Sequence, residues 1–235
     1  MQPLPDHLVA TLSVDPWFQT LPAAQQRALL ARCRPLRLAQ GQAAFAQGDP
    51  VPLAGQAFFG IVQGVVKMTS PHGDGDESLV AVLGAGGWFG ELSLLDGLPR
   101  AYSAVAVTDV ELLALSAPAF RSLMRSRAFA DAMARLLAAR LRRVYEVFLE
   151  GTLRSTRARL ARRLVLLAGG AVAHNPPDHA VVPVSQDSLA RTLGVTRQTL
   201  NKELKAMAEA GALSLRYGRI EIASMALLDK LASAG

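Results

Sequence analysis

The sequence predicts an α+β chain in three parts: a β-rich N-terminal domain, one long helix, and a small C-terminal domain of short helices and a β-hairpin. Short apolar runs separated by Gly-rich turns occupy residues 40–115, which is the pattern of an all-β domain. Apolar residues then recur at steps of three and four up to Glu150, the period of a helix. Two short helical segments around Gly194 follow. With 235 residues and 51% apolar content, the chain can form one large domain or two modest domains with real cores.

The N-terminal domain, expected over residues 1–118, has the turn spacing of a β-sandwich or barrel. An amphipathic segment before its strands, PAAQQRALLARC, predicts a helix packed on this domain. The stretch WFGELSLLDGLPRAYS is mostly apolar but carries an acid, Glu91, and a base, Arg100. Two charges in the core of a small domain are costly unless they pair or meet a polar ligand. A bound anion would explain Arg100, and an internal ion pair with Glu91 is the alternative.

Residues 119–151 are expected to form a dimerisation helix. A narrow apolar seam follows heptad spacing and is flanked by arginines, as in a two-stranded coiled coil. The chain offers no obvious second long helix to cover this seam, so we expect a homodimer. Its interface is expected to contain Leu137, Leu141, Val144 and Phe148. The alternative is an ordinary helix packed on its own β domain. Gly151 interrupts the helix and is the expected hinge.

Residues 152–235 are expected to form a winged helix-turn-helix domain. Ser185 is a good N-cap for a short helix that Gly194 ends, and Thr196 can cap a second helix over residues 197–210. Apolar positions on both helices give them a shared core. The segment ALSLRYGRIEI then alternates around a Tyr-Gly turn, which predicts the β-hairpin wing.

The second helix of this motif has the chemistry of a DNA reader. In the major groove Arg pairs with guanine and Gln with adenine, while hydroxyls and Lys contact phosphates. The residues expected to contact DNA are Ser185, Thr196, Arg197, Gln198, Thr199, Asn201, Lys202 and Lys205 on the helices, and Arg216 and Arg219 on the wing. Residues 135–235 carry a net charge of +8 and residues 1–134 a net charge of −2. Nucleic acid is the usual partner of such a basic half, so we expect double-stranded DNA.

Other classes of protein fit the sequence less well. The histidines lie in polar or Pro-rich loops, and no Gly-x-Ser-x-Gly or phosphate-loop pattern occurs, so we expect no catalytic site. One cysteine, Cys33, excludes an intramolecular disulfide and a cysteine-built metal or iron–sulfur cluster within one chain. His7 or His72 could ligate a haem; the alternative is that these histidines are only solvated residues of polar segments. No apolar run is long enough to span a membrane, and we expect a cytoplasmic protein without membrane contact.

Taken together, these motifs resemble the Crp/Fnr family of bacterial transcription regulators. The resemblance covers nearly the whole chain: GQAAFAQGD, FFGIVQGVVKM, FGELSLLDGLPRA and DVELLAL in the first part and VTRQTLNKELKAM in the last, in the family's order. It implies an N-terminal β jelly-roll like that of cyclic-nucleotide-binding domains, a long dimerisation helix and a C-terminal winged helix-turn-helix. The family's activity is transcription regulation, with RNA polymerase as a further partner if the protein is an activator.

The resemblance also implies an effector site in the stretch around Arg100. In cyclic-nucleotide-binding relatives the backbone after the first Gly of this motif holds the cyclic phosphate, the Glu holds the ribose hydroxyl, and the Arg pairs with the phosphate. The effector-binding residues implied here are Gly90, Glu91, Leu92, Ser93, Arg100 and Ala101. Ala101 stands where many bacterial nucleotide binders have Ser or Thr.

The same comparison places Val144 and Tyr145 where catabolite activator protein has two hydroxyl residues that bond adenine. Val144 offers no hydrogen bond, and Tyr145 can stack on a base or bond it. The effector options are therefore cAMP, cGMP, a cyclic dinucleotide, another phosphate-bearing molecule, or none if the sensor domain is purely structural. A regulatory module that acts on a protein partner is a further alternative for the first half alone.

Overall fold

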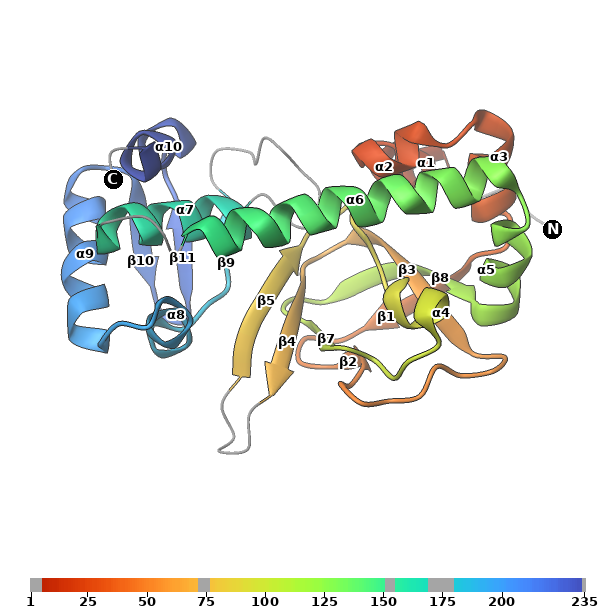
Figure 1. Ribbon diagram of the computed structural model, residues 1–235, viewed down its shortest axis with the longest axis horizontal. Coiled ribbons are helices and arrows are strands. Elements are labelled where there is room, and N and C mark those ends of the chain that lie inside the picture. Colours follow the sequence, from red (N-terminus) through yellow and green to blue (C-terminus); the bar gives the residue numbers. More distant parts are fainter. Residues whose placement is uncertain (1–5, 72–76, 151–154, 169–179, 234–235) are drawn as a thin grey trace. The chain divides into compact units, whose positions relative to one another are not determined.

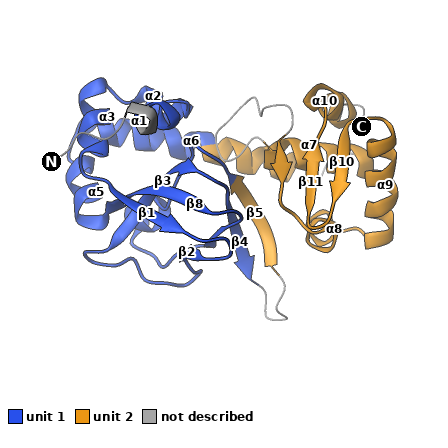
Figure 2. Cartoon of the chain, turned by 180° about the vertical axis from the view of Figure 1, so that it is seen from behind, with its two compact units in different colours: residues 1–71, 83–139 blue, residues 72–82, 140–235 orange. Residues whose placement is uncertain are grey.

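The computed structural model describes residues 6–71, 77–150, 155–168 and 180–233 (Figure 1). The chain forms two compact units: residues 1–71 with 83–139, and residues 72–82 with 140–235 (Figure 2). Within the described residues, no helix is long and apolar enough to cross a membrane. The predicted hinge Gly151 and His72 lie outside the described residues.

The first unit begins with three helices and continues into strands. The helices are α1 (Asp6–Leu12), α2 (Pro16–Thr20) and α3 (Ala23–Leu30). The strands that follow are β1 (Arg34–Leu38), β2 (Ala43–Phe45), β3 (Gln56–Gln63), β4 (Val66–Pro71), β5 (Glu77–Leu83), β6 (Trp88–Phe89), β7 (Ser103–Ala106) and β8 (Val110–Ser116), with α4 (Leu92–Asp96) between β6 and β7; residues 77–82 of β5 fall within the second unit. They form two four-stranded sheets, in the orders β1-β8-β3-β6 and β2-β7-β4-β5. The predicted β-rich domain is confirmed, and its strands begin at Arg34 rather than near residue 40.

Aromatic side chains fill the core of this unit. Trp88 stacks on Phe58, with ring centroids 5.2 Å apart, and on Phe18, at 5.9 Å. The indole Nε1 of Trp17 donates a hydrogen bond of 2.9 Å to the carbonyl oxygen of Ala132. Because Ala132 belongs to the long helix α6, this bond and the surrounding rings attach the first part of that helix to the β domain.

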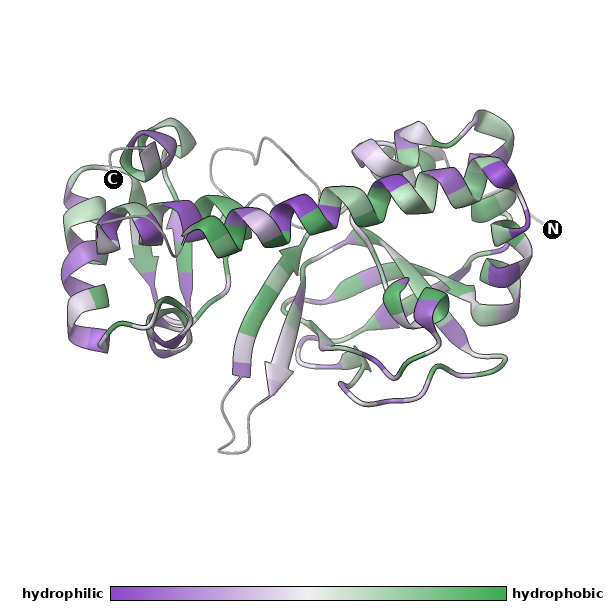
Figure 3. Cartoon of the chain, viewed as in Figure 1, coloured by the Kyte–Doolittle hydropathy of each residue, from purple (hydrophilic) through white to green (hydrophobic). Residues whose placement is uncertain are grey.

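The long helix is shorter than predicted at its start. The structure has two helices, α5 (Ala117–Met124) and α6 (Arg127–Glu150), where the sequence predicted one over residues 119–151. The chain turns between them so that Phe120 and Phe129, on different helices, meet edge to face at 5.8 Å in one core. Figure 3 shows hydrophobic and hydrophilic residues alternating along α6.

The second unit contains the C-terminal helices and a three-stranded sheet. Its elements are α7 (Thr156–Ala168), β9 (Val181–Val182), α8 (Gln186–Leu193), α9 (Arg197–Glu209), β10 (Leu213–Arg216), β11 (Arg219–Ile222) and α10 (Met225–Ser233). The sheet order is β10-β11-β9, with β10 and β11 antiparallel. The predicted helix-turn-helix and β-hairpin are therefore confirmed, with the second helix ending one residue early, at Glu209.

Candidate functional sites

The effector-site stretch begins with a glycine that no other residue replaces easily. Gly90 follows β6 with a φ of 99°, a value that favours glycine. A Cβ atom at this position would collide with the carbonyl oxygen of Ala57 and lie 3.3 Å from Nη1 of Arg100. The missing side chain therefore lets the backbone of this stretch lie against β3 and gives Arg100 its place.

Arg100 is held at both its backbone and its side chain. Its N–H donates to the carbonyl of Asp49 at 2.9 Å, and its carbonyl accepts from the N–H of Gly48 at 2.8 Å. Its Nη1 donates to the carbonyl of Gly90 at 2.8 Å and its Nη2 to that of Ala57 at 3.0 Å. A guanidinium has five N–H donors, so these two side-chain bonds do not exhaust it.

Arg100 lies beside an aromatic ring and near acidic groups. Its guanidinium carbon lies 4.1 Å from the centre of the Phe45 ring, a cation–π contact. Burial lowers the pKa of Arg100, and Tyr102, Glu91 and Asp49 oppose that shift. Glu91 is fully buried.

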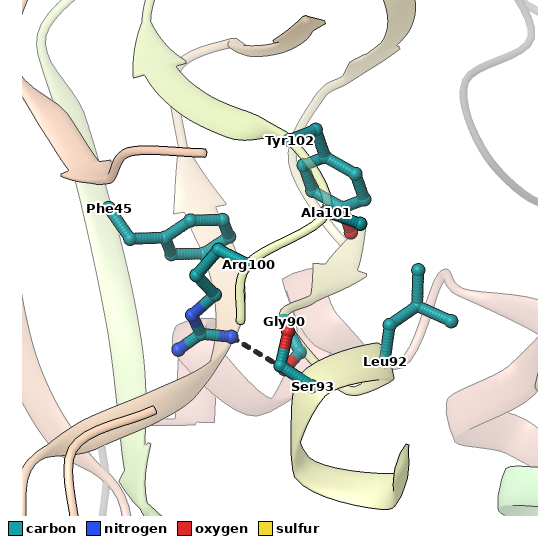
Figure 4. Close-up of a pocket in the computed structure, with 7 residues that line it drawn as sticks. All are labelled: Phe45, Gly90, Leu92, Ser93, Arg100, Ala101 and Tyr102. Carbon is teal, nitrogen blue, oxygen red and sulfur yellow. Dashed lines mark hydrogen bonds between the residues drawn. The ribbon is translucent and has the colours of Figure 1, made fainter. Parts of the chain in front are cut away.

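A small hollow opens beside Arg100 (Figure 4). The residues that line it are Phe45, Gly90, Leu92, Ser93, Arg100, Ala101 and Tyr102. The hollow thus brings together most of the predicted effector-binding residues, whereas Glu91 is buried outside its lining. Phe45 and Tyr102 were missed by the sequence reasoning. Their rings lie 6.0 Å apart, although they are far apart in the chain.

The predicted dimer seam lies on an exposed apolar stripe of α6. Leu141, Val144 and Phe148 are 51%, 60% and 77% exposed, and Leu137 is half-buried. Tyr145 and Leu149 are each 58% exposed and lie on the same side of the helix, since they follow Leu141 at steps of four. From Leu141 onward, these residues belong to the second compact unit. Val144 and Tyr145, which were predicted to contact the effector, are not among the residues that line the hollow.

Local hydrogen bonds fix the helix-turn-helix as predicted. The side chains of Ser185 and Thr196 accept from the N–H groups of Ser188 and Thr199. Gly194 ends α8 in the left-handed conformation, and Arg159 of α7 donates to the carbonyl of Leu193 at that end. The shared core contains Leu189, Ala190, Leu193, Leu200, Leu204 and Met207, with Val195 half-buried.

The first turn of α9 presents the predicted DNA-reading residues to the outside. Thr196, Arg197, Gln198, Thr199, Lys202 and Lys205 are exposed, and Asn201 is partly exposed. Nη1 of Arg197 lies 3.4 Å from a carboxylate oxygen of Asp187 in α8. This ion pair was not predicted. Both side chains are at least half exposed, so the pair is weak and can be exchanged for another anion.

The β10–β11 hairpin carries a second basic surface. Arg216 and Arg219 are exposed on either side of the turn at Tyr217 and Gly218, where Gly218 has a φ of 70°. Tyr217 is fully exposed. Both arginines form ion pairs with Glu221, a residue that the sequence reasoning did not select.

Comparison with protein families matches two parts of the chain. Residues 35–127 match the cyclic nucleotide-binding domain, and residues 158–231 match the Crp-like helix-turn-helix domain. The first match contains the hollow and the second contains α8, α9 and the hairpin.

Characterised relatives match most of the chain. It is 38% identical over 197 residues to the cyclic AMP receptor protein of Thermus thermophilus, covering 82% of this chain and 85% of the relative. It is 31% identical over 208 residues to a CRP-like cAMP-activated global transcriptional regulator of Mycobacterium tuberculosis, covering 84% and 88%.

A solved structure agrees in fold. A CRP/FNR-family transcriptional regulator from Thermus thermophilus superposes with a TM-score of 0.62 at 25% identity, covering 86% of this chain and 99% of that one. The relatives are regulators, not enzymes. On the strength of both domain matches and these relatives, the chain belongs to the Crp/Fnr family of DNA-binding transcription regulators.

Proposed function

We propose that the protein is a homodimeric, sequence-specific transcription regulator of the bacterial cytoplasm whose DNA affinity is set by a phosphate-bearing effector, with a cyclic nucleotide as the favoured class. The observation that carries this proposal is Arg100, a guanidinium held by main-chain carbonyls at the edge of a hollow in the cyclic-nucleotide-binding domain. Arg is the side chain best suited to bind a phosphate.

The shape of the hollow suits the phosphate end of a ligand. It is a shallow depression rather than an enclosed cavity, so only a group that lies against its surface can occupy it. The phosphate would lie against Arg100 and the backbone of Gly90, Leu92 and Ser93, and the rest of the effector would extend out of the hollow. The names of the relatives, a cyclic AMP receptor and a cAMP-activated regulator, support a cyclic nucleotide.

The aromatic pair beside Arg100 bears on which effector binds. Phe45 and Tyr102 line the hollow, and such rings can pack on a ribose or a base. Val144 and Tyr145 on α6 are proposed to contact the base, Tyr145 through its ring or hydroxyl. Because Val144 cannot form a hydrogen bond, cGMP and cyclic dinucleotides stay candidates beside cAMP.

The apolar stripe on α6 supports a second copy of the chain as its partner. Large apolar side chains exposed side by side are costly in water and typical of an interface. The stripe repeats with the spacing of a coiled-coil seam, and an identical helix offers it a matching surface. The proposed interface contains Leu137, Leu141, Val144 and Phe148, to which Tyr145 and Leu149 are added.

Two copies of α9 suit a two-fold symmetric DNA site. Helix-turn-helix dimers place their reading helices about 34 Å apart, one turn of B-DNA. We propose that Arg197, Gln198 and Lys202 contact bases and that Ser185, Thr196, Thr199, Asn201 and Lys205 position the helix, with Arg216 and Arg219 on the backbone. An effector that binds the correctly spaced dimer more tightly shifts the population toward it. Activation would also require contact with RNA polymerase.

Fluorescence anisotropy tests the proposal as a whole. The labelled duplex would be one that the purified protein selects from a random library, titrated without effector and with cAMP, cGMP or cyclic di-GMP. We expect at least one of them to raise the affinity about tenfold, which corresponds to about 1.4 kcal/mol of coupling free energy. Equal affinity under all conditions would favour the purely structural sensor domain. Failure of the protein to select any duplex from the library would contradict the DNA-binding role.

A further inference from the structure

Three charged side chains lie on one face of the β10–β11 hairpin: Arg216, Arg219 and Glu221. The strands pair Ser214 with Glu221 and Arg216 with Arg219. Because side chains alternate along a strand, these residues share one face of the hairpin. The other face carries Leu213, Leu215, Ile220 and Ile222, which are buried or half-buried. The core therefore fixes which side the two arginines occupy.

Glu221 lies between the two arginines and bonds both. Its Oε1 is 3.1 Å from Nε of Arg219, and its Oε2 is 3.5 Å from Nε of Arg216. The hydroxyl of Ser214 donates to the same Oε2 at 3.3 Å. Partial desolvation opposes ionisation, but the hydrogen bonds from Arg219 and Ser214 and the charges of both arginines outweigh it. The pKa of Glu221 is therefore lower than its usual value, and the side chain is a carboxylate at neutral pH.

This arrangement has the donors that a DNA phosphate would use. A phosphate, like a carboxylate, accepts hydrogen bonds from guanidinium groups and from a hydroxyl. The arginine side chains are 61% and 55% exposed, so an outside anion can reach them. Glu221 is only 29% exposed, but solvent reaches the pairs from the side of the arginines, and ion pairs open to water in this way are weak enough to be exchanged.

We propose that the carboxylate of Glu221 competes with DNA phosphate for Arg216 and Arg219. It thereby limits the sequence-independent affinity of the hairpin for DNA. The inference rests on the proposed DNA contacts of this hairpin. With Glu221 charged, the cluster has a net charge of +1; without that charge it has +2 and attracts the DNA backbone more strongly. Because phosphate contacts do not discriminate between sequences, the gain would apply to any duplex.

A limit on sequence-independent DNA affinity is useful in this chain, because residues 135–235 carry a net charge of +8. Non-specific sites outnumber specific ones in a genome by many orders of magnitude. A regulator that binds all DNA too strongly is therefore held away from its own sites. An internal carboxylate lowers this background without removing the arginines.

A purely structural role for Glu221 makes a different prediction. Like charges directly opposite each other on paired strands are destabilising, so Glu221 also offsets repulsion between Arg216 and Arg219. If that were its whole role, neutral variants would unfold more easily and bind DNA no better. The salt dependence of DNA binding separates the two roles, because it counts phosphate contacts.

The variants are Glu221→Gln, which removes the charge at constant size, and Glu221→Thr, which removes it with a good strand-forming residue. Glu221→Asp keeps the charge. The matched control is Asp229→Asn, which makes the same change of charge at an exposed position of α10. Anisotropy is measured between about 50 and 200 mM salt with a random-sequence duplex and with the selected duplex, and each variant is checked by thermal unfolding.

We expect both neutral variants to bind the random duplex about tenfold more tightly at low salt. The slope of log K against log salt should steepen by about 0.9 per protomer, one phosphate contact each. Glu221→Asp and Asp229→Asn should keep the wild-type slope. An unchanged or shallower slope in both neutral variants would overturn the proposal, as would the same steepening in Asp229→Asn. Absence of salt-dependent binding by the wild type itself would instead contradict the proposed DNA contacts.

Discussion

Arg100 and Phe45 form a contact at the lining of the hollow: the guanidinium carbon lies 4.1 Å from the centre of the ring. Phe45 ends β2 and Arg100 precedes β7, and these strands pair with each other. The pairing of two strands far apart in the sequence therefore brings the ring and the cation together. The same cation donates to the carbonyl of Gly90, so three separate segments determine where a phosphate would bind.

Replacing Gly90 by alanine should damage both the hollow and the domain. A Cβ atom would collide with the Ala57 carbonyl oxygen and crowd Arg100. A non-glycine residue at a φ of 99° is also strained, at a cost of roughly 1–3 kcal/mol. Because the collision adds to the strain, we expect urea unfolding to show a loss larger than that, together with lost effector binding. Gly97→Ala is the control, because it also has a positive φ but nothing within 4 Å of its Cβ. Equal effects of the two variants would contradict this account.

Placing a charge in the apolar stripe should separate the protomers. Val144 is 60% exposed in one chain, and in the proposed dimer Val144→Glu would bury a carboxylate against its own copy. Light scattering on a dilution series should then give the mass of a single chain, 25.0 kDa. Arg135→Glu, at an exposed position of α6 outside the stripe, should stay dimeric. A dimeric Val144→Glu protein would contradict the proposed seam.

Alanine substitutions in α9 should separate base contacts from phosphate contacts. Arg197→Ala should cost about 1–3 kcal/mol in affinity for the selected duplex and relax the sequence preference at one base pair. Lys205→Ala should weaken binding to all duplexes alike and make the salt slope shallower. Anisotropy with selected and random duplexes measures both. If Arg197→Ala weakened binding to both duplexes equally, Arg197 would be a phosphate contact and not a base reader.

The thiol of Cys33 should be unreactive in the folded protein. Burial raises its pKa to about 12, whereas an unfolded cysteine has a pKa of about 8.5. Since the folded state disfavours the thiolate, stability should fall as the pH rises above about 8.5, by up to about 1.4 kcal/mol per pH unit, and level off near 12. Labelling with a thiol reagent at pH 8 should require unfolding.

Two comparisons test this assignment of the thiol. The variant Cys33→Ala should lose the part of the alkaline destabilisation that the thiol causes. Rapid labelling of the native wild-type protein at pH 8 would contradict the buried position of Cys33.

Local chemistry explains which features could be predicted. The ends of α8 and α9 depend on Ser185, Gly194 and Thr196, whose capping effects act within a few residues. The β-hairpin and its turn at Tyr217 and Gly218 follow from alternation and a turn signal in the same way. The motif around Gly90 and Arg100 could be recognised because its residues are close in the chain.

The features that were missed depend on tertiary packing. Phe45 and Tyr102 line the hollow because β2 and β7 pair, and nothing near Phe45 in the sequence indicates that partner. The break between α5 and α6 was missed because both segments are helical, and only the turn between them brings Phe120 and Phe129 into one core. Glu221 alternates with apolar residues as any strand residue does, and its pairing with two arginines follows only from the register of the hairpin.

The effector role of Arg100 is tested most directly by isothermal titration of protein that has been unfolded, freed of ligand and refolded. The ligands are cAMP, cGMP and cyclic di-GMP, and the proteins are the wild type, Arg100→Lys and Arg100→Ala. We expect one ligand to bind the wild type, Arg100→Lys to bind it more weakly because it lacks the paired donors, and Arg100→Ala to show no binding. Unchanged binding by Arg100→Ala, or no heat from any ligand in wild-type protein that still binds DNA, would contradict a phosphate site at Arg100.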